Sequence, residues 1–271
     1  MSSSALPSPP FLPIPGMSNF RDIGLTPVSS PPDSHIKPGV LFRSGYPSNI
    51  DPSGLQQLQE LGITHVYDLR STIEVQRDGQ NGRDGSKAME KYGMKRYWTP
   101  VFKDEDYSPE MMLIRFKDYA REGTEGFTTA YHSILLSGAA SFTALFLHLA
   151  YTPTACLIHC TAGKDRTGVF VALVLGLCGC SDDAIAAEYA LTELGFAERK
   201  AETMEMLLKL DGLSGDRSGV ERMVSARKEN MLATLEMIRR EFGGVEEYVR
   251  RNCGLKDRDV ETIRERLVVS D

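Results

Sequence analysis

One stretch of the sequence constrains the fold more than any other. A short apolar segment, residues 155–159, is followed by a polar loop that contains a glycine and then by a longer apolar segment, residues 167–179. The first segment has the length and composition of a buried strand, and the second those of a buried helix. A strand that leads directly into a helix is typical of an α/β fold, in which helices cover a sheet.

The chain from residue 20 onward agrees with this fold class. Short apolar runs at residues 40–42, 63–69 and 96–102 are predicted strands. Helix starts are predicted where a capping residue precedes a proline, at Asp51 and at Ser108. We therefore expect a central, mostly parallel sheet flanked by helices.

Three further regions complete the predicted domain. Residues 127–150 are expected to form a helical region that is interrupted near Gly138. Residues 77–87 contain no apolar side chain and are predicted to form a solvated loop. The chain from residue 201 onward is predicted to be helical, which adds extra C-terminal helices to the domain.

The first 16 residues include five prolines among serines. This composition is typical of an extended segment with polyproline II character. We expect residues 1–16 to form a Pro-rich tail outside the core, followed by a single domain over residues 17–271. A chain of 271 residues is within reach of one α/β domain with added helices.

The charge distribution limits the classes of partner. Lys and Arg number 31 against 37 Asp and Glu, a formal charge of −6, and no long basic block occurs. Nucleic acid is therefore not an expected partner. The apolar run at residues 169–180 is too short to cross a bilayer, which needs about 20 residues, so no stable membrane insertion is expected. A phosphate-handling site would have to be local, because the net charge repels anions, and the oligomeric state is left open.

The five cysteines indicate a reducing compartment. Their number is odd, four lie in one apolar region, and no C-x-x-C pair occurs. This pattern does not resemble a disulfide framework. The first residues also lack the basic and apolar regions of a signal peptide, so a cytoplasmic location is expected. The histidines are scattered, which predicts neither a metal site nor a cofactor.

The loop between the two apolar segments has the residues of an anion cradle. Five residues separate Cys160 from Arg166. Backbone N–H groups of Thr161, Ala162, Gly163 and Lys164 can turn inward and join those of the first turn of the following helix. Gly163 permits a positive φ, and Lys164 is expected to add a positive charge at the rim. The planar fork of Arg166 can hold two phosphate oxygens.

Cys160 is predicted to lie at the base of this cradle. The same N–H groups that bind phosphate favour a thiolate, and Thr167 can donate its hydroxyl to the sulfur. A thiolate below a bound phosphate is placed for in-line attack, which gives a phosphocysteine intermediate without a metal. A Walker A loop does not fit, because Asp165 follows Gly163-Lys164. A phosphate-binding protein without activity and a rhodanese-type sulfurtransferase are the alternatives.

Residues 159–168, with the sequence His-Cys-Thr-Ala-Gly-Lys-Asp-Arg-Thr-Gly, resemble the signature loop of the protein tyrosine phosphatase superfamily. The branch that this loop is most similar to is the tyrosine/serine (dual- or triple-specificity) phosphatases of bacteria and fungi. The resemblance extends over residues 16–267, including residues 19–24, 41–44 and 68–71 with Glu74. It implies the cysteine-phosphatase fold and hydrolysis of phosphate monoesters. The implied substrates are phosphorylated proteins, phosphotyrosine first with phosphoserine or phosphothreonine possible, or phosphoinositides.

Several candidate residues surround the nucleophile. The leaving oxygen needs a proton from an acid, and the resemblance implies Asp165 in that role. Asp104 and Asp106 remain alternatives, because they follow Trp98-Thr99-Pro100 on a neighbouring segment.

Three further side chains are candidates for supporting the loop. Asp68 and Arg70 end a predicted strand at the edge where α/β sites form, and they either support the loop or form a surface ion pair. His159 is expected to orient the loop through hydrogen bonds.

Overall fold

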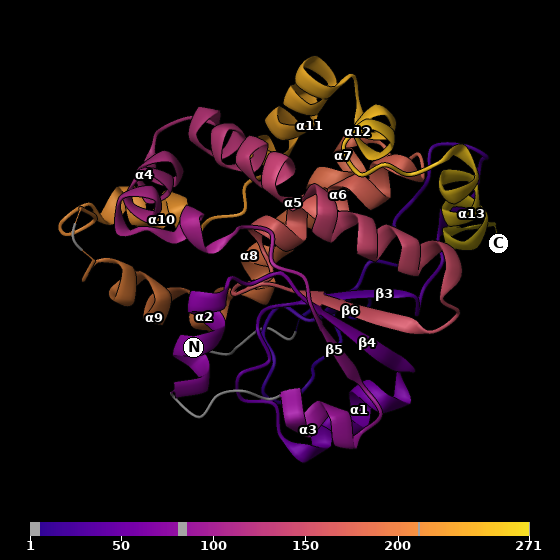
Figure 1. The fold of residues 1–271 in the computed structure, drawn as a ribbon, viewed down its shortest axis with the longest axis horizontal. Helices are drawn as coiled ribbons and strands as arrows, with labels where there is room; N and C mark the ends of the chain where they lie inside the picture. Colours follow the sequence, from indigo (N-terminus) through magenta and orange to yellow (C-terminus); the bar gives the residue numbers. More distant parts are fainter. Residues whose placement is uncertain (1–5, 81–85, 211, 271) are drawn as a thin grey trace.

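The computed structural model describes residues 6–80, 86–210 and 212–270, and its centre is a five-stranded sheet (Figure 1). The strand order is β1–β3–β6–β4–β5. The pairs β3–β6, β6–β4 and β4–β5 are parallel, whereas β1 is antiparallel to β3. The predicted mostly parallel sheet is confirmed. Its strands are β1 (Arg21–Asp22), β3 (Leu41–Ser44), β4 (Ile63–Asp68), β5 (Lys95–Trp98) and β6 (Ala155–His159).

The central strand β6 is buried along its whole length. Ala155 and Leu157 pack into a hydrophobic cluster on one face of the sheet, whereas Cys156 and Ile158 pack into the larger cluster on the other face. A strand covered on both faces shows a continuous apolar run instead of alternation. This explains why the sequence of β6 is apolar at every position up to its final residue.

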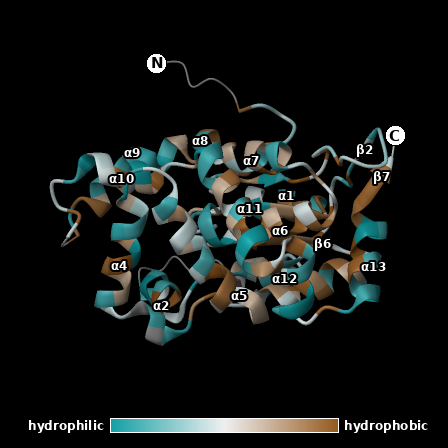
Figure 2. Cartoon of the chain, turned by 90° about the horizontal axis from the view of Figure 1, so that it is seen from above, coloured by the Kyte–Doolittle hydropathy of each residue, from teal (hydrophilic) through white to brown (hydrophobic). Residues whose placement is uncertain are grey.

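Helices cover both faces of the sheet (Figure 1). α1 and α3 pack beside β4 and β5 on one face, and α5 and α6 lie on the other, with further helices outside them. Figure 2 shows hydrophobic residues running through this second layer. These helices are α1 (Pro52–Glu60), α3 (Ser86–Lys91), α5 (Glu125–Tyr151), α6 (Asp165–Leu177), α7 (Asp182–Ala190), α11 (Lys228–Phe242), α12 (Val245–Arg251) and α13 (Asp257–Leu267).

A third group of helices gathers at the end of the sheet where the parallel strands terminate (Figure 1). A separate hydrophobic cluster, which includes Ala120, Met204 and Val220, holds α4, α9 and α10 together. The group consists of α2 (Thr72–Gln80), the 3-10 helix η1 (Asp104–Tyr107), α4 (Pro109–Ala120), α8 (Thr192–Gly195), α9 (Ala197–Leu207) and α10 (Arg217–Val224). The carboxyl end of the sheet is therefore enclosed by helices from distant parts of the chain.

Local capping explains where the helices predicted from proline begin. The Asp51 carboxylate accepts a hydrogen bond from the N–H of Gly54 at 2.8 Å, and Pro52 follows at the first helical position. The Ser108 hydroxyl accepts one from the N–H of Met111 at 3.3 Å in the same way. Each cap satisfies a backbone donor that the helix itself leaves without a partner. Both predicted helix starts are confirmed.

The predicted interruption of the long helix near Gly138 was wrong, because α5 is continuous. A Cβ at Gly138 would lie 2.9 Å from the Phe142 ring, so this glycine serves close packing and does not break the helix. Within the described ranges, α5 is the one helix long and apolar enough to cross a membrane. Half of its most apolar window is buried inside the protein, as in the core helix of a globular domain.

The predicted loop over residues 77–87 was also wrong in part. Residues 77–80 complete α2, and residues 86–87 begin α3, whereas residues 81–85 lie outside the described ranges. Asp78 is buried and forms an ion pair of 2.6 Å with Arg70. The last turn of α2 is held by this ion pair with buried Arg70 and not by apolar packing. The lack of apolar residues in this segment therefore did not indicate a loop.

The N-terminal segment is partly built into the domain. The side chains of Phe11 and Ile14 are buried, and Phe11 forms an isolated antiparallel bridge with Arg21. The expectation of a tail outside the core was therefore wrong for this stretch, and residues 1–5 lie outside the described ranges. A two-stranded sheet of β2 (Ser34–Ile36) and β7 (Val268–Ser270) ties the two ends of the chain together. The expectation that residues 17–271 form a single domain stays a prediction.

Candidate active site

The candidate loop, residues 160–164, connects the carboxyl end of β6 to the first turn of α6. Gly163 has a φ of +66°, in the left-handed region that favours glycine. A Cβ at this position would also overlap the backbone oxygen of Ser44, at the end of the neighbouring strand β3. Both observations explain the glycine: the loop turns sharply and lies directly against β3.

All five carbonyl groups of the loop have partners outside it. Because C=O and the following N–H of a trans peptide point in opposite directions, this arrangement directs the amides of residues 161–165 to the other side. None of those five amides donates a hydrogen bond to another described residue. The carbonyl partners are His159 Nδ1 for Cys160 (3.2 Å), Tyr46 N for Thr161 (3.0 Å), Asn19 Nδ2 for Ala162 (3.2 Å), Arg43 Nη2 for Gly163 (2.7 Å) and Gly168 N for Lys164 (2.7 Å).

Successive amides that face one side form an anion-binding nest. The positive end of the α6 dipole lies at the same place and adds to the attraction. The loop therefore has the shape that the predicted phosphate cradle requires. The substrate contacts assigned to Thr161, Ala162, Gly163 and Lys164 stay predictions.

A buried ionic cluster holds this loop from behind. Glu188 of α7 pairs with Arg21 at 2.7 Å and with Arg43 at 2.5 Å, and Arg43 in turn contacts the Gly163 carbonyl. Burial alone would raise the pKa of Glu188, but the two arginines outweigh it and hold that pKa below its usual range. The structural role of Asn19, Arg43 and Glu188 was not predicted. Only the resemblance of residues 19–24 and 41–44 gave a signal for the first two.

Cys160 lies at the floor of the loop and is 2% exposed. The predicted hydrogen bond from Thr167 to its sulfur is not formed. Thr167 is fully buried in the first turn of α6, and its hydroxyl has no partner in the described part of the chain. Buried hydroxyl groups without a partner are uncommon. Because Thr167 lies in the first turn of α6, directly after the loop, its hydroxyl can donate to an anion bound at the loop.

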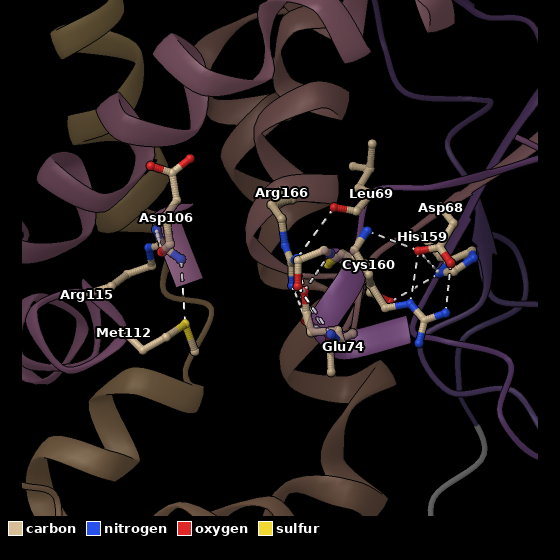
Figure 3. Close-up of polar contacts among 12 residues, drawn as sticks. Asp68, Leu69, Glu74, Asp106, Met112, Arg115, His159, Cys160 and Arg166 are labelled. Atoms are coloured by element: carbon tan, nitrogen blue, oxygen red, sulfur yellow. Dashed lines mark hydrogen bonds and ion pairs between the residues drawn. The ribbon is translucent and has the colours of Figure 1, made fainter. Parts of the chain in front are cut away.

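Arg166 is fixed by a residue that the sequence analysis did not assign to the site. Glu74, in the first turn of α2, accepts two parallel hydrogen bonds from Arg166, at 2.6 and 2.8 Å (Figure 3). Thr161 also donates its hydroxyl to Glu74. Burial would raise the pKa of Glu74, but Arg166 outweighs it and holds that pKa well below its usual range. Only the position of Glu74 in the quoted resemblance marked it.

Lys164 is not at the rim of the site, and that expectation was wrong. Its side chain is 4% exposed, and its ammonium lies 2.6 Å from the Asp165 carboxylate. The same ammonium lies over the rings of Phe127 (4.9 Å) and Tyr119 (5.5 Å). An ion pair and two aromatic faces replace the water that the cation loses. Burial would lower the pKa of Lys164, but Asp165 outweighs it and raises that pKa.

The three candidate acids occupy different places. Asp165 is the first residue of α6, directly after the loop, and accepts hydrogen bonds on Oδ1 from Lys164 and from the hydroxyl of Tyr131, the latter at 2.8 Å. Asp106 caps η1 by accepting the N–H of Lys103 at 3.1 Å. Figure 3 shows Asp106 in a group of side chains apart from Cys160 and Arg166. Asp104 is exposed on the same 3-10 helix. The geometry favours Asp165, whose role as acid stays a prediction.

Asp68 and Arg70 form a buried network, so a surface ion pair was the wrong alternative. Asp68 is fully buried and accepts hydrogen bonds from Arg70 at 2.7 and 2.9 Å and from Arg96 at 2.7 Å. His159 lies 3.8 Å from Asp68 (Figure 3). The His159 ring also lies beside the Tyr46 ring, which Arg70 covers.

The network sets the charge of its members. Burial would raise the pKa of Asp68, but His159 and the arginines hold it well below its usual range. Burial lowers the pKa of His159 to about 4. The imidazole is therefore neutral near pH 7, which suits the predicted role of His159 as a hydrogen-bonding support for the loop.

The fold and the loop together define a class of enzyme. A strand–loop–helix unit that presents a thiol, inward amides and a clamped arginine at the carboxyl end of a parallel sheet is the arrangement of the cysteine-dependent phosphatases.

Comparison with known proteins identifies the family within this class. A model of the tyrosine phosphatase family matches residues 12–269. The triple specificity protein phosphatase PtpB of Mycobacterium tuberculosis is 33% identical over 217 residues, which cover 72% of this chain and 73% of that protein. A putative tyrosine-protein phosphatase of Cupriavidus necator is 26% identical, covering 86% of this chain and 81% of its own. The chain therefore belongs to the tyrosine phosphatase family.

Proposed function

We propose that this protein removes phosphate from phosphotyrosine residues of proteins, through a phosphocysteine intermediate and without a metal ion. The observation that carries the proposal is the loop geometry. Five successive carbonyls point away from the loop, so that its amides face the side on which Cys160 and Arg166 meet a substrate. Preorganised donors of this kind stabilise the charge that develops on phosphoryl oxygens in the transition state.

In the first step, the Cys160 thiolate attacks phosphorus from the side opposite the ester oxygen. The Sγ–P bond forms and the P–O bond to tyrosine breaks, so that the electron pair leaves with the tyrosine oxygen. Asp165 donates the proton that this oxygen needs. Arg166 and the loop amides bind the three equatorial oxygens throughout, and Glu74 keeps the guanidinium in place.

In the second step, water attacks the phosphocysteine. Asp165, now ionised, takes a proton from the water as the new O–P bond forms and the Sγ–P bond breaks. The products are inorganic phosphate and the Cys160 thiolate, and Asp165 regains its proton. The thiolate and the acid are thus both restored for another cycle.

The choice among phosphate esters follows from two observations. The relative from M. tuberculosis is described as a triple specificity protein phosphatase, which supports activity on more than one kind of phosphorylated residue. The resemblance implies phosphoinositides as well, and a cation at the rim would help to bind their several phosphates, but the Lys164 side chain is buried against Asp165. We therefore place phosphotyrosine first, phosphoserine and phosphothreonine second, and phosphoinositides last.

The test is hydrolysis of phosphotyrosine, phosphoserine and phosphothreonine peptides and of a phosphoinositide, each with and without EDTA. Cys160→Ser is the inactive variant. Cys156→Ser is its matched control, because Cys156 is a buried thiol four residues earlier, within strand β6. We expect phosphotyrosine to give the highest kcat/KM, EDTA to have no effect, and only Cys160→Ser to abolish the activity.

Two results would contradict the proposal. If Cys160→Ser kept its rate while Cys156→Ser lost it, the nucleophile would be elsewhere. If the wild type released no phosphate from any ester but bound inorganic phosphate or transferred sulfur from thiosulfate to cyanide, a binding protein or a sulfurtransferase would replace the phosphatase.

A further inference from the structure

We propose that Tyr131 and Tyr189 are positioning residues for proton transfer, because their hydroxyl groups form a hydrogen-bonded chain that orients the Asp165 carboxyl. The inference deepens the proposed function, since it rests on Asp165 as the acid. Tyr131 comes from α5 and Tyr189 from α7, and the two hydroxyl groups meet next to Asp165, the first residue of α6. Both rings are buried, at 0% and 1% exposed.

The direction of the hydrogen bonds, from donor to acceptor, follows from the number of protons that each phenol can donate. The Tyr131 hydroxyl lies 2.8 Å from Asp165 Oδ1 and donates to it. The Tyr131 and Tyr189 hydroxyls lie 2.7 Å apart. A phenol has one proton to donate, so Tyr189 must be the donor to Tyr131. The chain therefore runs from Tyr189 through Tyr131 to Asp165.

Both phenols keep their protons over the working range of an enzyme. Burial raises the pKa of Tyr131 well above its usual value, and the charge of Asp165 adds to this effect. Burial likewise raises the pKa of Tyr189 to about 12. Neither tyrosine serves as the acid itself. Tyr189 remains a donor that orients the Tyr131 hydroxyl, and Tyr131 remains a donor that orients the Asp165 carboxyl.

A second donor, Lys164, determines which oxygen of the Asp165 carboxyl is free to carry the proton that is transferred to the leaving group. Lys164 reaches the same Oδ1 at 2.6 Å, held in place by the rings of Tyr119 and Phe127. Asp165 Oδ2 makes no hydrogen bond to any residue within the described ranges. Two donors on Oδ1 fix the plane of the carboxyl and leave Oδ2 as the oxygen that carries the transferred proton.

The consequence is specific to the leaving group. An acid matters most when the departing oxygen is a strong base and least when it leaves readily as an anion. If the tyrosine chain orients Asp165, removing a hydroxyl should slow esters of basic phenols and spare esters of acidic ones. A role in packing alone would slow both esters equally.

The experiment compares phenyl phosphate, whose phenolate is a strong base, with 2,4-dinitrophenyl phosphate, whose phenolate is a weak one. Tyr131→Phe and Tyr189→Phe each delete a hydroxyl and keep the ring, and Asp165→Asn is the reference for loss of the acid. Tyr248→Phe is the matched control, because its buried hydroxyl donates to the Leu135 carbonyl and not to Asp165 or to either of the two tyrosines. The readout is the ratio of kcat for the two esters, which cancels any difference in the fraction of folded enzyme.

We expect Tyr131→Phe to lose about 10- to 100-fold on phenyl phosphate and less than about threefold on the dinitrophenyl ester. The loss on phenyl phosphate should not exceed the roughly 100- to 10,000-fold contribution of general acid catalysis, because the acid itself is still present. Tyr189→Phe should lose about three- to tenfold on phenyl phosphate alone, and Tyr248→Phe should keep the wild-type ratio. Equal losses on both esters in Tyr131→Phe, beside an unequal loss in Asp165→Asn, would overturn the inference and leave the phosphatase intact. A wild type inactive on both esters would instead overturn the proposed function.

Discussion

Replacing Glu74 by glutamine removes the charge that holds Arg166 and keeps the size of the side chain. Two hydrogen bonds of 2.6 and 2.8 Å join the carboxylate to the guanidinium in the wild type. A hydrogen bond to a charged group contributes about 1.5–3 kcal/mol. If one such contribution is lost from the placement of Arg166 in the transition state, kcat/KM falls between about 10-fold and 150-fold.

The assay is hydrolysis of an aryl phosphate, together with inhibition by inorganic phosphate, which competes for the same cradle. We expect Glu74→Gln to lower kcat/KM by the amount given above and to weaken phosphate inhibition. Glu246→Gln is the matched control, because Glu246 pairs with Arg250 at 2.7 Å and with Arg264 at 2.5 Å on the surface, away from the loop. Surface pairs contribute about 0–1 kcal/mol.

One result would refute the proposed role of Glu74 in holding Arg166 for catalysis. If Glu74→Gln kept kcat/KM within about threefold of the wild type and bound phosphate equally well, the clamp on Arg166 would have no role in catalysis.

Two further predictions follow from the packing of the loop and from a buried imidazole. Gly163→Ala should destabilise the protein by about 1–3 kcal/mol and abolish activity, because the position has a φ of +66° and a Cβ would overlap the Ser44 carbonyl oxygen. Thermal unfolding measures the loss of stability, and the rate of aryl phosphate hydrolysis measures the loss of activity. Burial lowers the pKa of His148 to about 4, so the unfolded chain binds the proton more readily. The contribution of His148 to stability should be complete above about pH 6.5 and should be lost by up to about 1.4 kcal/mol per pH unit toward pH 4. Urea unfolding of His148→Gln should therefore show a smaller dependence of stability on pH than the wild type.

The parts of the fold that could be predicted from sequence are those that local chemistry decides. The apolar run of β6, the glycine at position 163 and the capping residues Asp51 and Ser108 act through their own neighbours. The mostly parallel sheet and the connection from β6 through a loop to α6 were accordingly predicted correctly. Gly138 was misread because a glycine in a helix can mark either a break or a close approach. Here the Phe142 ring, one turn further along the same helix, lies where a Cβ at position 138 would be crowded.

The parts that sequence reasoning missed depend on residues far apart in the chain. Glu74 and Arg166 are 92 positions apart, and Arg43 and Glu188 are 145 apart. The periodicity of apolar residues predicts helices and strands, but it does not predict contacts between residues so far apart in the sequence. Lys164 was expected at the rim as an added positive charge, and nothing in the sequence marks it as an exception to the usual exposure of lysine. Its burial requires a carboxylate and aromatic faces that only the folded chain supplies.

The most direct test of the account is to find the phosphoryl group on the enzyme. Asp165→Asn, mixed with 2,4-dinitrophenyl phosphate and quenched rapidly, should accumulate the intermediate, because the ester leaves without an acid while water lacks its base. Mass spectrometry of the digest should then place one phosphoryl group on Cys160. Turnover with no phosphoryl group on Cys160, or with the group on another residue, would contradict the thiolate mechanism.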